Sequence, residues 1–201
     1  MVRRTGVALC VTFSLAAAAV AATRSLTIVP AQSRMTIEVG KAGVFSFAGH
    51  AHEVVGPIGG RVTLDPEKLE DSTVRIEIDT TALKVSGKGE PPDDVPKVQQ
   101  AMERQVLDIA RYPTIAFEST AVTVKNRSAT AIDLTVNGRL TLHGVTRSVS
   151  APVSAEISAD ALKATGRLTV KQTDYGIKPV SVGGVVNVKD ALNITFTIVA
   201  R

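Results

Sequence analysis

The residues of this chain that are best suited to chemistry are its histidines. His50 and His52 are separated by one residue, and His143 is the third histidine of the sequence. Side chains two positions apart on a β-strand point to the same side, so the first two would supply half of a zinc site. Glu53 would point the opposite way, and a Gly-Pro pair stands where a further carboxylate ligand is needed. The pattern therefore favours histidines at the surface or at the mouth of a barrel, and we predict no metal site.

Other residue patterns associated with catalysis are absent from the sequence. No glycine-rich phosphate loop precedes a helical segment, and no serine stands in the setting of a nucleophile elbow. The neighbouring carboxylates Asp93 and Asp94 follow a loop, and they fit the cap of a helix better than an acid–base pair. We therefore predict a protein that is not an enzyme and that uses no cofactor.

The first 21 residues are predicted to be a signal peptide. Arg3 and Arg4 form a basic region, residues 6–20 carry no charge, and residues 19–21 (AVA) offer small side chains for cleavage. The apolar stretch is shorter than the ~20 residues that a membrane-spanning helix needs. We expect export to the periplasm, by the general or the twin-arginine route, and a single domain over residues 22–201.

Cleavage would leave a domain of 180 residues without cysteine, because Cys10 lies inside the leader. Such a domain has no disulfide, no thiolate nucleophile and no thiolate metal site. It would carry 21 basic and 19 acidic residues, with four phenylalanines, two tyrosines and no tryptophan. This composition offers no basic, aromatic surface, so we predict no nucleic-acid partner.

Residues 132–142 alternate between apolar and polar types in the manner of a β-strand. Apolar residues occupy the even positions of this run and polar residues the odd positions, apart from Gly138. A glycine in the apolar phase permits a bend or a bulge. The run is therefore one long bent strand or two short strands that meet at a corner. Alternation of this length is typical of an antiparallel barrel or sandwich.

The rest of the chain reads as further strands and one helix. Alternation recurs in segments such as 74–79 and 192–198. A helix is predicted over residues 95–110, where apolar residues recur at helical spacing before Pro113; these are Val98, Met102, Val106 and Ile109. The predicted fold class is all-β with one short helix.

Three segments, in this order, resemble the signatures of the YceI-like family. They are residues 112–120 (YPTIAFEST), 137–147 (NGRLTLHGVTR) and 173–177 (TDYGI). His52, which precedes a Val-Val-Gly run, is similar to the first motif of that family, and residues 106–108 (VLD) resemble the end of its helix. The resemblance extends over residues 26–200, nearly the whole of the predicted mature domain.

The resemblance implies an antiparallel eight-stranded β-barrel, lipocalin-like in architecture, with a long apolar cavity. It also implies a non-catalytic protein that binds, transports or stores a polyisoprenoid lipid, such as a prenyl quinone or a prenyl diphosphate. The expected partner is that isoprenoid lipid or quinone. Transient contact with the membrane or with membrane proteins, and a homodimer, are further expectations.

Two alternatives to lipid binding remain open at this point. Aliphatic residues alone do not separate a cavity from a filled barrel, because both need the same inward side chains. The residue pattern by itself favours the filled barrel, whereas the resemblance favours the cavity. The first alternative is therefore a ligand-free structural or stress-response protein of the periplasm. The second is a metal-binding protein that uses the His-x-His pair.

We expect the ligand to contact inward-facing strand positions and the mouth of the barrel. The candidate ligand-binding residues are Phe45, Phe47, His52, Ile78, Phe117, Leu134, Val136, Leu140, Leu142, Val170, Tyr175 and Phe196. Arg139 and Arg147 lie on the polar side of the central run and would meet a diphosphate or a quinone carbonyl if they reach the mouth. The predicted helix is expected to cover one end of the barrel and to gate the entry of the ligand.

Overall fold

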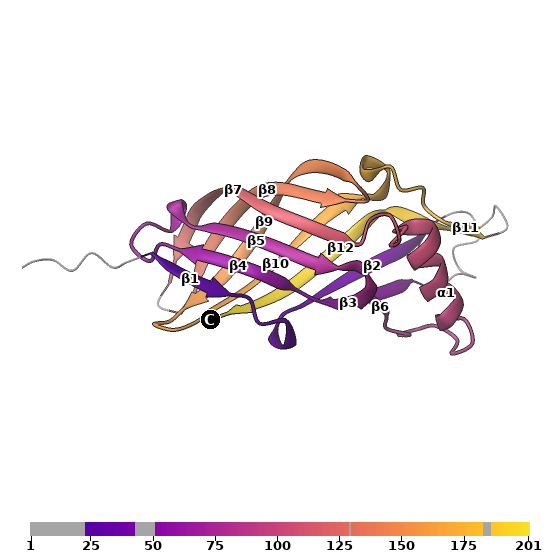
Figure 1. The fold of residues 1–201 in the computed structure, drawn as a ribbon, viewed down its shortest axis with the longest axis horizontal. Helices are drawn as coiled ribbons and strands as arrows, with labels where there is room; N and C mark the ends of the chain where they lie inside the picture. The colour runs from indigo at the N-terminus through magenta and orange to yellow at the C-terminus, as the bar shows by residue number, and fades with distance from the viewer. Residues whose placement is uncertain (1–22, 43–50, 129, 183–185) are drawn as a thin grey trace, which may run out of the picture.

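The strands form one antiparallel sheet that curls into an elongated body (Figure 1). The structure is a computed structural model that describes residues 23–42, 51–128, 130–182 and 186–201. In chain order the strands of this part are β1 (Arg24–Thr27), β2 (Arg34–Ala42), β3 (His52–Pro57), β4 (Gly59–Leu64), β5 (Thr73–Asp79), β6 (Lys84–Val85), β7 (Thr114–Arg127), β8 (Ile132–Leu142), β9 (Val145–Ile157), β10 (Leu162–Lys171), β11 (Ser181–Val182) and β12 (Val186–Ala200).

The order of the strands shows how the sheet curls. Neighbours follow the order β1-β4-β5-β7-β8-β9-β10-β12-β2-β3-β6, and β11 pairs with β12. Strands β3 and β4 lie near opposite ends of this order, yet Ile58 alone separates them in the chain. The two ends of the sheet are therefore brought together around a central space. The predicted antiparallel all-β fold with one short helix is confirmed.

The expected count of eight strands is not confirmed, because the described part of the chain contains twelve. Two interruptions account for part of the difference. The 3₁₀ turn η1 (Pro30–Gln32) separates β1 from β2, and Ile58 separates β3 from β4. Pro30 and Ile58 thus stand at breaks between consecutive strands of the curled sheet, and β6 and β11 contribute only two residues each.

The seam where the sheet meets itself, residues 27–33 against residues 199–201, is closed by hydrogen bonds. Thr27 and Arg201 exchange two backbone hydrogen bonds, of 2.6 and 3.0 Å, and the Val29 N–H donates to the Val199 carbonyl at 2.8 Å. Ser33 is 2% exposed, and its hydroxyl oxygen accepts a hydrogen bond from the Val199 N–H at 3.0 Å. A side chain thus satisfies this partly buried strand amide.

The central run forms the single strand β8, and no corner interrupts it at Gly138. The irregularity lies instead in the neighbouring strand, where the register of β7 slips between Ser119 and Ala121. A Cβ atom on Gly138 would lie 2.4 Å from the ring of Phe117 and 2.5 Å from the Glu118 carbonyl oxygen. The glycine is therefore required by the close approach of Phe117, and the alternative of two short strands is wrong.

The single helix is shorter than predicted. Helix α1 spans Val95–Ala101 and continues as one wider π-helical turn, η5 (Met102–Val106), in which the Leu107 N–H donates to the Met102 carbonyl at 2.9 Å. The helical path ends before residue 110, because Asp108 adopts a left-handed backbone with φ of 44°. Asp94 stands at the N-cap but makes no capping hydrogen bond; its carboxylate pairs with Lys97 at 2.7 Å.

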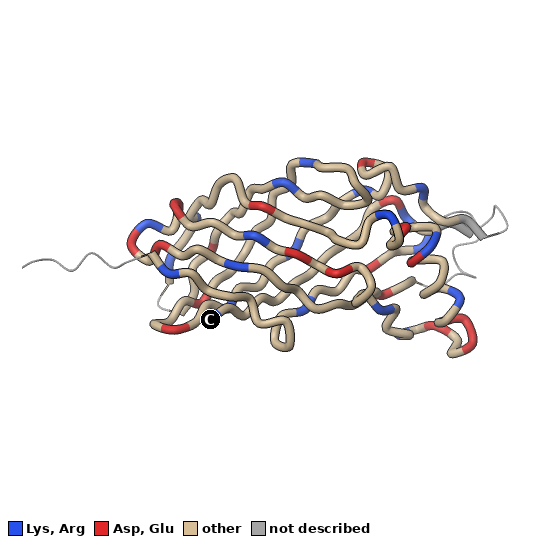
Figure 2. The backbone as a smooth tube through the Cα atoms, in the orientation of Figure 1, with Lys and Arg blue, Asp and Glu red and all other residues tan. Residues whose placement is uncertain are grey.

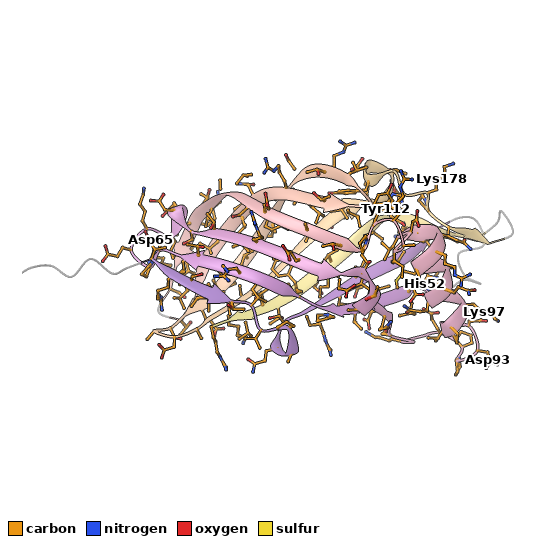
Figure 3. All side chains as sticks on the ribbon, in the orientation of Figure 1. His52, Asp65, Asp93, Lys97, Tyr112 and Lys178 are labelled. Carbon is orange, nitrogen blue, oxygen red and sulfur yellow. The ribbon has the colours of Figure 1, made fainter. Side chains whose placement is uncertain are left out.

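The two ends of the curled sheet are covered by different elements. Helix α1 lies across the end where β2, β3 and β6 stand (Figure 1). The 3₁₀ turn η3 (Leu69–Asp71) connects β4 to β5 at the opposite end, and Leu69 is buried there. In Figure 3, Lys97 marks the helix end and Asp65 marks the η3 end. The central space is therefore bounded at both ends.

Charged residues of both signs are spread along the strands and the connecting turns (Figure 2). On the outer surface, the Glu118 carboxylate pairs with Arg75 at 2.8 Å and with Arg139 at 3.1 Å. All three side chains are more than 40% exposed, so their pairing contributes little to stability. Arg139 consequently lies on the outside of β8 and does not reach the mouth.

Candidate ligand-binding cavity

An apolar cavity of about 230 Å³ lies inside the curled sheet. Among the residues that the structure describes, thirty-seven line it, and all of these are apolar except Ser72 and Gln172. Several lining side chains, such as Phe117, Leu134 and Phe196, are packed against the core yet only partly buried. These three side chains also line the cavity. The interior is therefore not filled by its own side chains.

Alternation along the strands places the lining residues. On β8 the even positions Leu134, Val136, Leu140 and Leu142 face the cavity, while Arg139 and its odd-numbered neighbours face outward. The other strands of the sheet contribute in the same way. A sheet that is polar outside and aliphatic inside must enclose an apolar interior once it curls.

The elements at both ends also contribute to the lining. Met102, Val106 and Leu107 come from η5 and the residue after it, at the helix end. Leu69 and Ser72 come from η3 and the residue after it, at the opposite end. The cavity therefore has lining residues at both covered ends of the sheet.

Seven of the twelve predicted ligand-binding residues line the cavity. These are Ile78, Phe117, Leu134, Val136, Leu140, Leu142 and Phe196. Phe45 and Phe47 lie outside the described residues. His52, Val170 and Tyr175 are described but do not line the cavity. A role of the seven in ligand binding stays a prediction, which their position makes testable.

His52 faces a carboxylate instead of the cavity. Its Nδ1 lies 2.8 Å from Glu90 Oε1, and the side chains of His52 and Glu90 are 25% and 1% exposed. His143 occupies the turn between β8 and β9, with a φ of 51°, and its ring centroid lies 4.4 Å from that of Tyr112. His50 lies outside the described residues. Within the described ranges, no group of three or more His, Cys, Asp or Glu is placed to hold a metal ion.

Polar contacts tie the helix cover to the sheet. The Gln99 side chain accepts from the Val85 N–H at 2.8 Å and donates to the Leu83 carbonyl at 3.0 Å. Lys88 pairs with Glu53 at 3.3 Å. A hydrogen bond from Ser86, helped by Lys88, lowers the pKa of Glu53 below its ordinary value. The predicted gating by the helix would require these contacts to open.

Several lining residues were not among the predicted ones. Ala151, Ala155 and Ala164 face the cavity from β9 and β10, and their small side chains leave room inside the sheet. The alternation of Ala151, Val153 and Ala155 with polar residues was present in the sequence and would have identified them. Gln172 carries no such signal, because it lies in the 3₁₀ turn η6 (Gln172–Tyr175) and not in a strand.

Tyr175 is buried beside the cavity without lining it. The residue is 1% exposed, and its hydroxyl has no hydrogen-bond partner in the described part of the chain. Burial, together with the nearby charge of Asp174, raises the pKa of Tyr175 above its ordinary value. Arg147 donates from Nε to the Asp174 carbonyl at 3.0 Å, so this guanidinium is engaged at the η6 turn.

Replacing Tyr175 with phenylalanine is expected to raise the free energy of unfolding by about 1 kcal/mol, because the variant removes a buried hydroxyl without a partner. As the pH rises, the unfolded tyrosine loses its proton before the folded one does. The wild type should therefore lose stability at alkaline pH more steeply than the variant. Urea unfolding at neutral and alkaline pH measures both effects. A less stable variant at neutral pH would contradict the absence of a partner for this hydroxyl.

In the described part of the chain, no helix combines the length and the apolar composition needed to cross a membrane. The predicted signal peptide, residues 1–21, lies outside the described residues.

Solved structures of other proteins share this fold. Burkholderia cenocepacia BcnA superposes with a TM-score of 0.66 at 19% identity, covering 87% of this chain and 99% of that one. A polyisoprenoid binding domain from Saccharophagus degradans, implicated in plant cell wall breakdown, superposes with a TM-score of 0.62 at 13% identity, covering 88% and 97%. At these identities the likeness shows the fold alone.

The sequence itself shows the family. A UPF0312 protein of Pseudomonas savastanoi pv. phaseolicola is 28% identical over 127 residues, which are 59% of this chain and 59% of that protein. The chain thus spans less than two thirds of this curated relative. The model of the YceI-like domain, in contrast, matches residues 26–200. With that match over most of its length, this chain belongs to the family of YceI-like domains.

Proposed function

We propose that this protein binds the chain of a polyisoprenoid lipid inside the curled sheet. The observation that carries the proposal is the apolar cavity, which has lining residues at two covered ends and only two polar residues in the described part of its lining. Burial of apolar surface contributes roughly 25 cal/mol per Å², so a prenyl chain would bind there through its length and shape. The polyisoprenoid binding domain with a similar fold supports the same class of ligand.

The size of the cavity bears on how much of a chain it holds. At about 230 Å³ it exceeds the cavity of about 150 Å³ that takes up benzene in an engineered protein, yet it falls short of the roughly 300–1,000 Å³ of common ligand pockets. We propose that the cavity accepts a segment of a prenyl chain in the present conformation. A longer chain would require α1 and η5 to move away from the helix end.

The proposal includes the architecture and the location of the protein. We interpret the sheet as a lipocalin-like barrel of eight strands, in which β1–β2 and β3–β4 each count as one interrupted strand and β6 and β11 are short additions. We propose a carrier or storage protein of the periplasm, exported by residues 1–21, without catalytic activity. Delivery of the lipid would involve transient contact with a membrane or with membrane proteins.

The first test is mass spectrometry of an organic extract of the protein purified from its native exported fraction. We expect a prenyl quinone or another prenyl lipid in stoichiometric amount, which a sample unfolded and washed before extraction has lost. An empty extract, together with no uptake of added prenyl lipid, would favour the ligand-free structural protein instead. A protein that stays with the cells after their periplasmic contents have been released would contradict export.

A further inference from the structure

Gln172 is a polar side chain in an otherwise apolar wall. It lies at the start of η6, at the helix end of the cavity, and the residue is 2% exposed. Its Nε2 donates one hydrogen bond to the Lys189 carbonyl at 2.8 Å. A primary amide has a second N–H and a carbonyl oxygen. Among the residues that the structure describes, neither of these two groups has a partner.

The turn that carries Gln172 is held firmly against β12. The backbone N–H and the hydroxyl of Thr173 donate to the Asp190 carboxylate at 2.9 and 2.7 Å. These hydrogen bonds lower the pKa of Asp190 below its ordinary value, so the carboxylate stays ionised as an acceptor at neutral pH. Gln172 therefore presents its amide to the cavity from a fixed position, before any ligand arrives.

The described lining of the cavity offers no group that balances a charge, because none of these residues is charged. The stretches 43–50 and 183–185, which the structure does not describe, contain no Lys, Arg, Asp or Glu, and their one titratable residue is His50. Arg139 lies on the outer surface with Glu118, and Arg147 is engaged with the Asp174 carbonyl. An anionic head group drawn into this cavity would lose its hydration without gaining a cationic partner, which is strongly unfavourable.

We infer, on the basis of the proposed function, that the cavity selects a prenyl lipid with an uncharged head group, and that Gln172 is the residue that recognises it. The amide donates to a carbonyl oxygen, as in a quinone, or accepts from a hydroxyl, as in a prenyl alcohol. The tail then extends from the helix end toward η3, along the aliphatic lining. A prenyl diphosphate is excluded because its charge has no partner at Gln172.

Ser72 provides an internal comparison at the opposite end. It is the second polar lining residue, and its hydroxyl oxygen already accepts from the Asp65 N–H at 3.0 Å. The hydroxyl offers one donor and no carbonyl oxygen, so it recognises a head group less completely than the amide does. The substitution Ser72→Ala is therefore the matched control for Gln172→Leu.

The test compares three probes that share one prenyl chain: farnesene without a head group, farnesol with a neutral one, and farnesyl diphosphate with a charged one. Binding to the full folded protein is measured by displacement of a fluorescent apolar probe. In the wild type we expect farnesol to bind about three- to tenfold tighter than farnesene, the gain from one hydrogen bond. Farnesyl diphosphate should bind at least about tenfold more weakly than farnesol.

The variants assign this preference to a residue. Gln172→Leu should remove the advantage of farnesol over farnesene, and a circular dichroism spectrum that matches that of the wild type shows that the variant is folded. Ser72→Ala should retain the advantage. Equal binding of farnesyl diphosphate, or loss of the advantage in Ser72→Ala alone, overturns the inference and leaves the proposed function standing. If none of the three probes binds to the wild type, the proposed function itself fails, and the inference with it.

Discussion

Replacing Gly138 with alanine is expected to lower the free energy of unfolding by about 3 kcal/mol. The new Cβ would lie 2.4 Å from the Phe117 ring and 2.5 Å from the Glu118 carbonyl oxygen, closer than any real contact of this kind. Overpacking of this type typically costs about 1–3 kcal/mol, and the strand propensity of alanine offsets only a fraction of that. Chemical unfolding of the two proteins at neutral pH measures the difference.

Two further variants separate the ring from the backbone in this effect. In a Phe117→Ala background the ring is absent but the Glu118 carbonyl remains, so we expect Gly138→Ala to lower the free energy of unfolding there by less than it does in the wild type, yet still measurably. Gly59→Ala is the matched control, because its Cβ would meet nothing closer than the Glu77 carbonyl oxygen at 3.4 Å. A Gly138→Ala protein as stable as the Gly59→Ala protein would contradict the packing of Phe117 described above.

Replacing Ala151 with leucine is expected to weaken the binding of a prenyl chain about fiftyfold. Ala151 lies on β9 opposite Val136 of β8, is 7% exposed and lines the cavity. The three added carbons would occupy space otherwise taken by the ligand. At about 0.8 kcal/mol per buried methylene the displaced part of the chain loses about 2.4 kcal/mol, which is roughly fiftyfold in affinity. Titration with farnesol or a prenyl quinone measures the change.

The control for this variant lies at the next residue. Ser150 is exposed on the outer face of the same strand, so Ser150→Leu adds the same carbons without entering the cavity. We expect Ser150→Leu to bind as the wild type does. The thermal stability of Ala151→Leu should not fall, because its side chain fills free space. Equal binding by both variants would show that the ligand does not occupy the cavity near Ala151.

Much of the fold follows from alternation in the sequence. The run that predicts a strand over residues 132–142 matches β8 at both ends, because every apolar position faces one side. The packing at Gly138 does not follow from it. From the sequence, Gly138 indicates a bend or a corner, but in the structure the ring of Phe117 covers it from the neighbouring strand. A contact between residues distant in the sequence leaves no trace in the local pattern of either strand.

The residues of the candidate site also fall into those that the sequence predicts and those that it does not. The strand residues Phe117, Leu134 and Val136 follow from their phase, so the aliphatic lining could be predicted before the structure. Gln172 could not, because its role depends on the 3₁₀ turn that points its amide inward. The early end of the helix depends on the backbone of Asp108, which takes a left-handed conformation that helical periodicity does not encode.

The seam between residues 27–33 and residues 199–201 has a consequence for how this chain is made. Strand β12 pairs with β10, formed just before it, and with β2, formed near the beginning. While the ribosome is still adding β12, both β10 and β2 present open edges that invite pairing with other chains. Folding of the sheet must therefore wait until synthesis is nearly finished. In a nascent chain of this protein, the edges of β10 and β2 therefore stay unpaired longest, and these edges are also the positions most prone to aggregate.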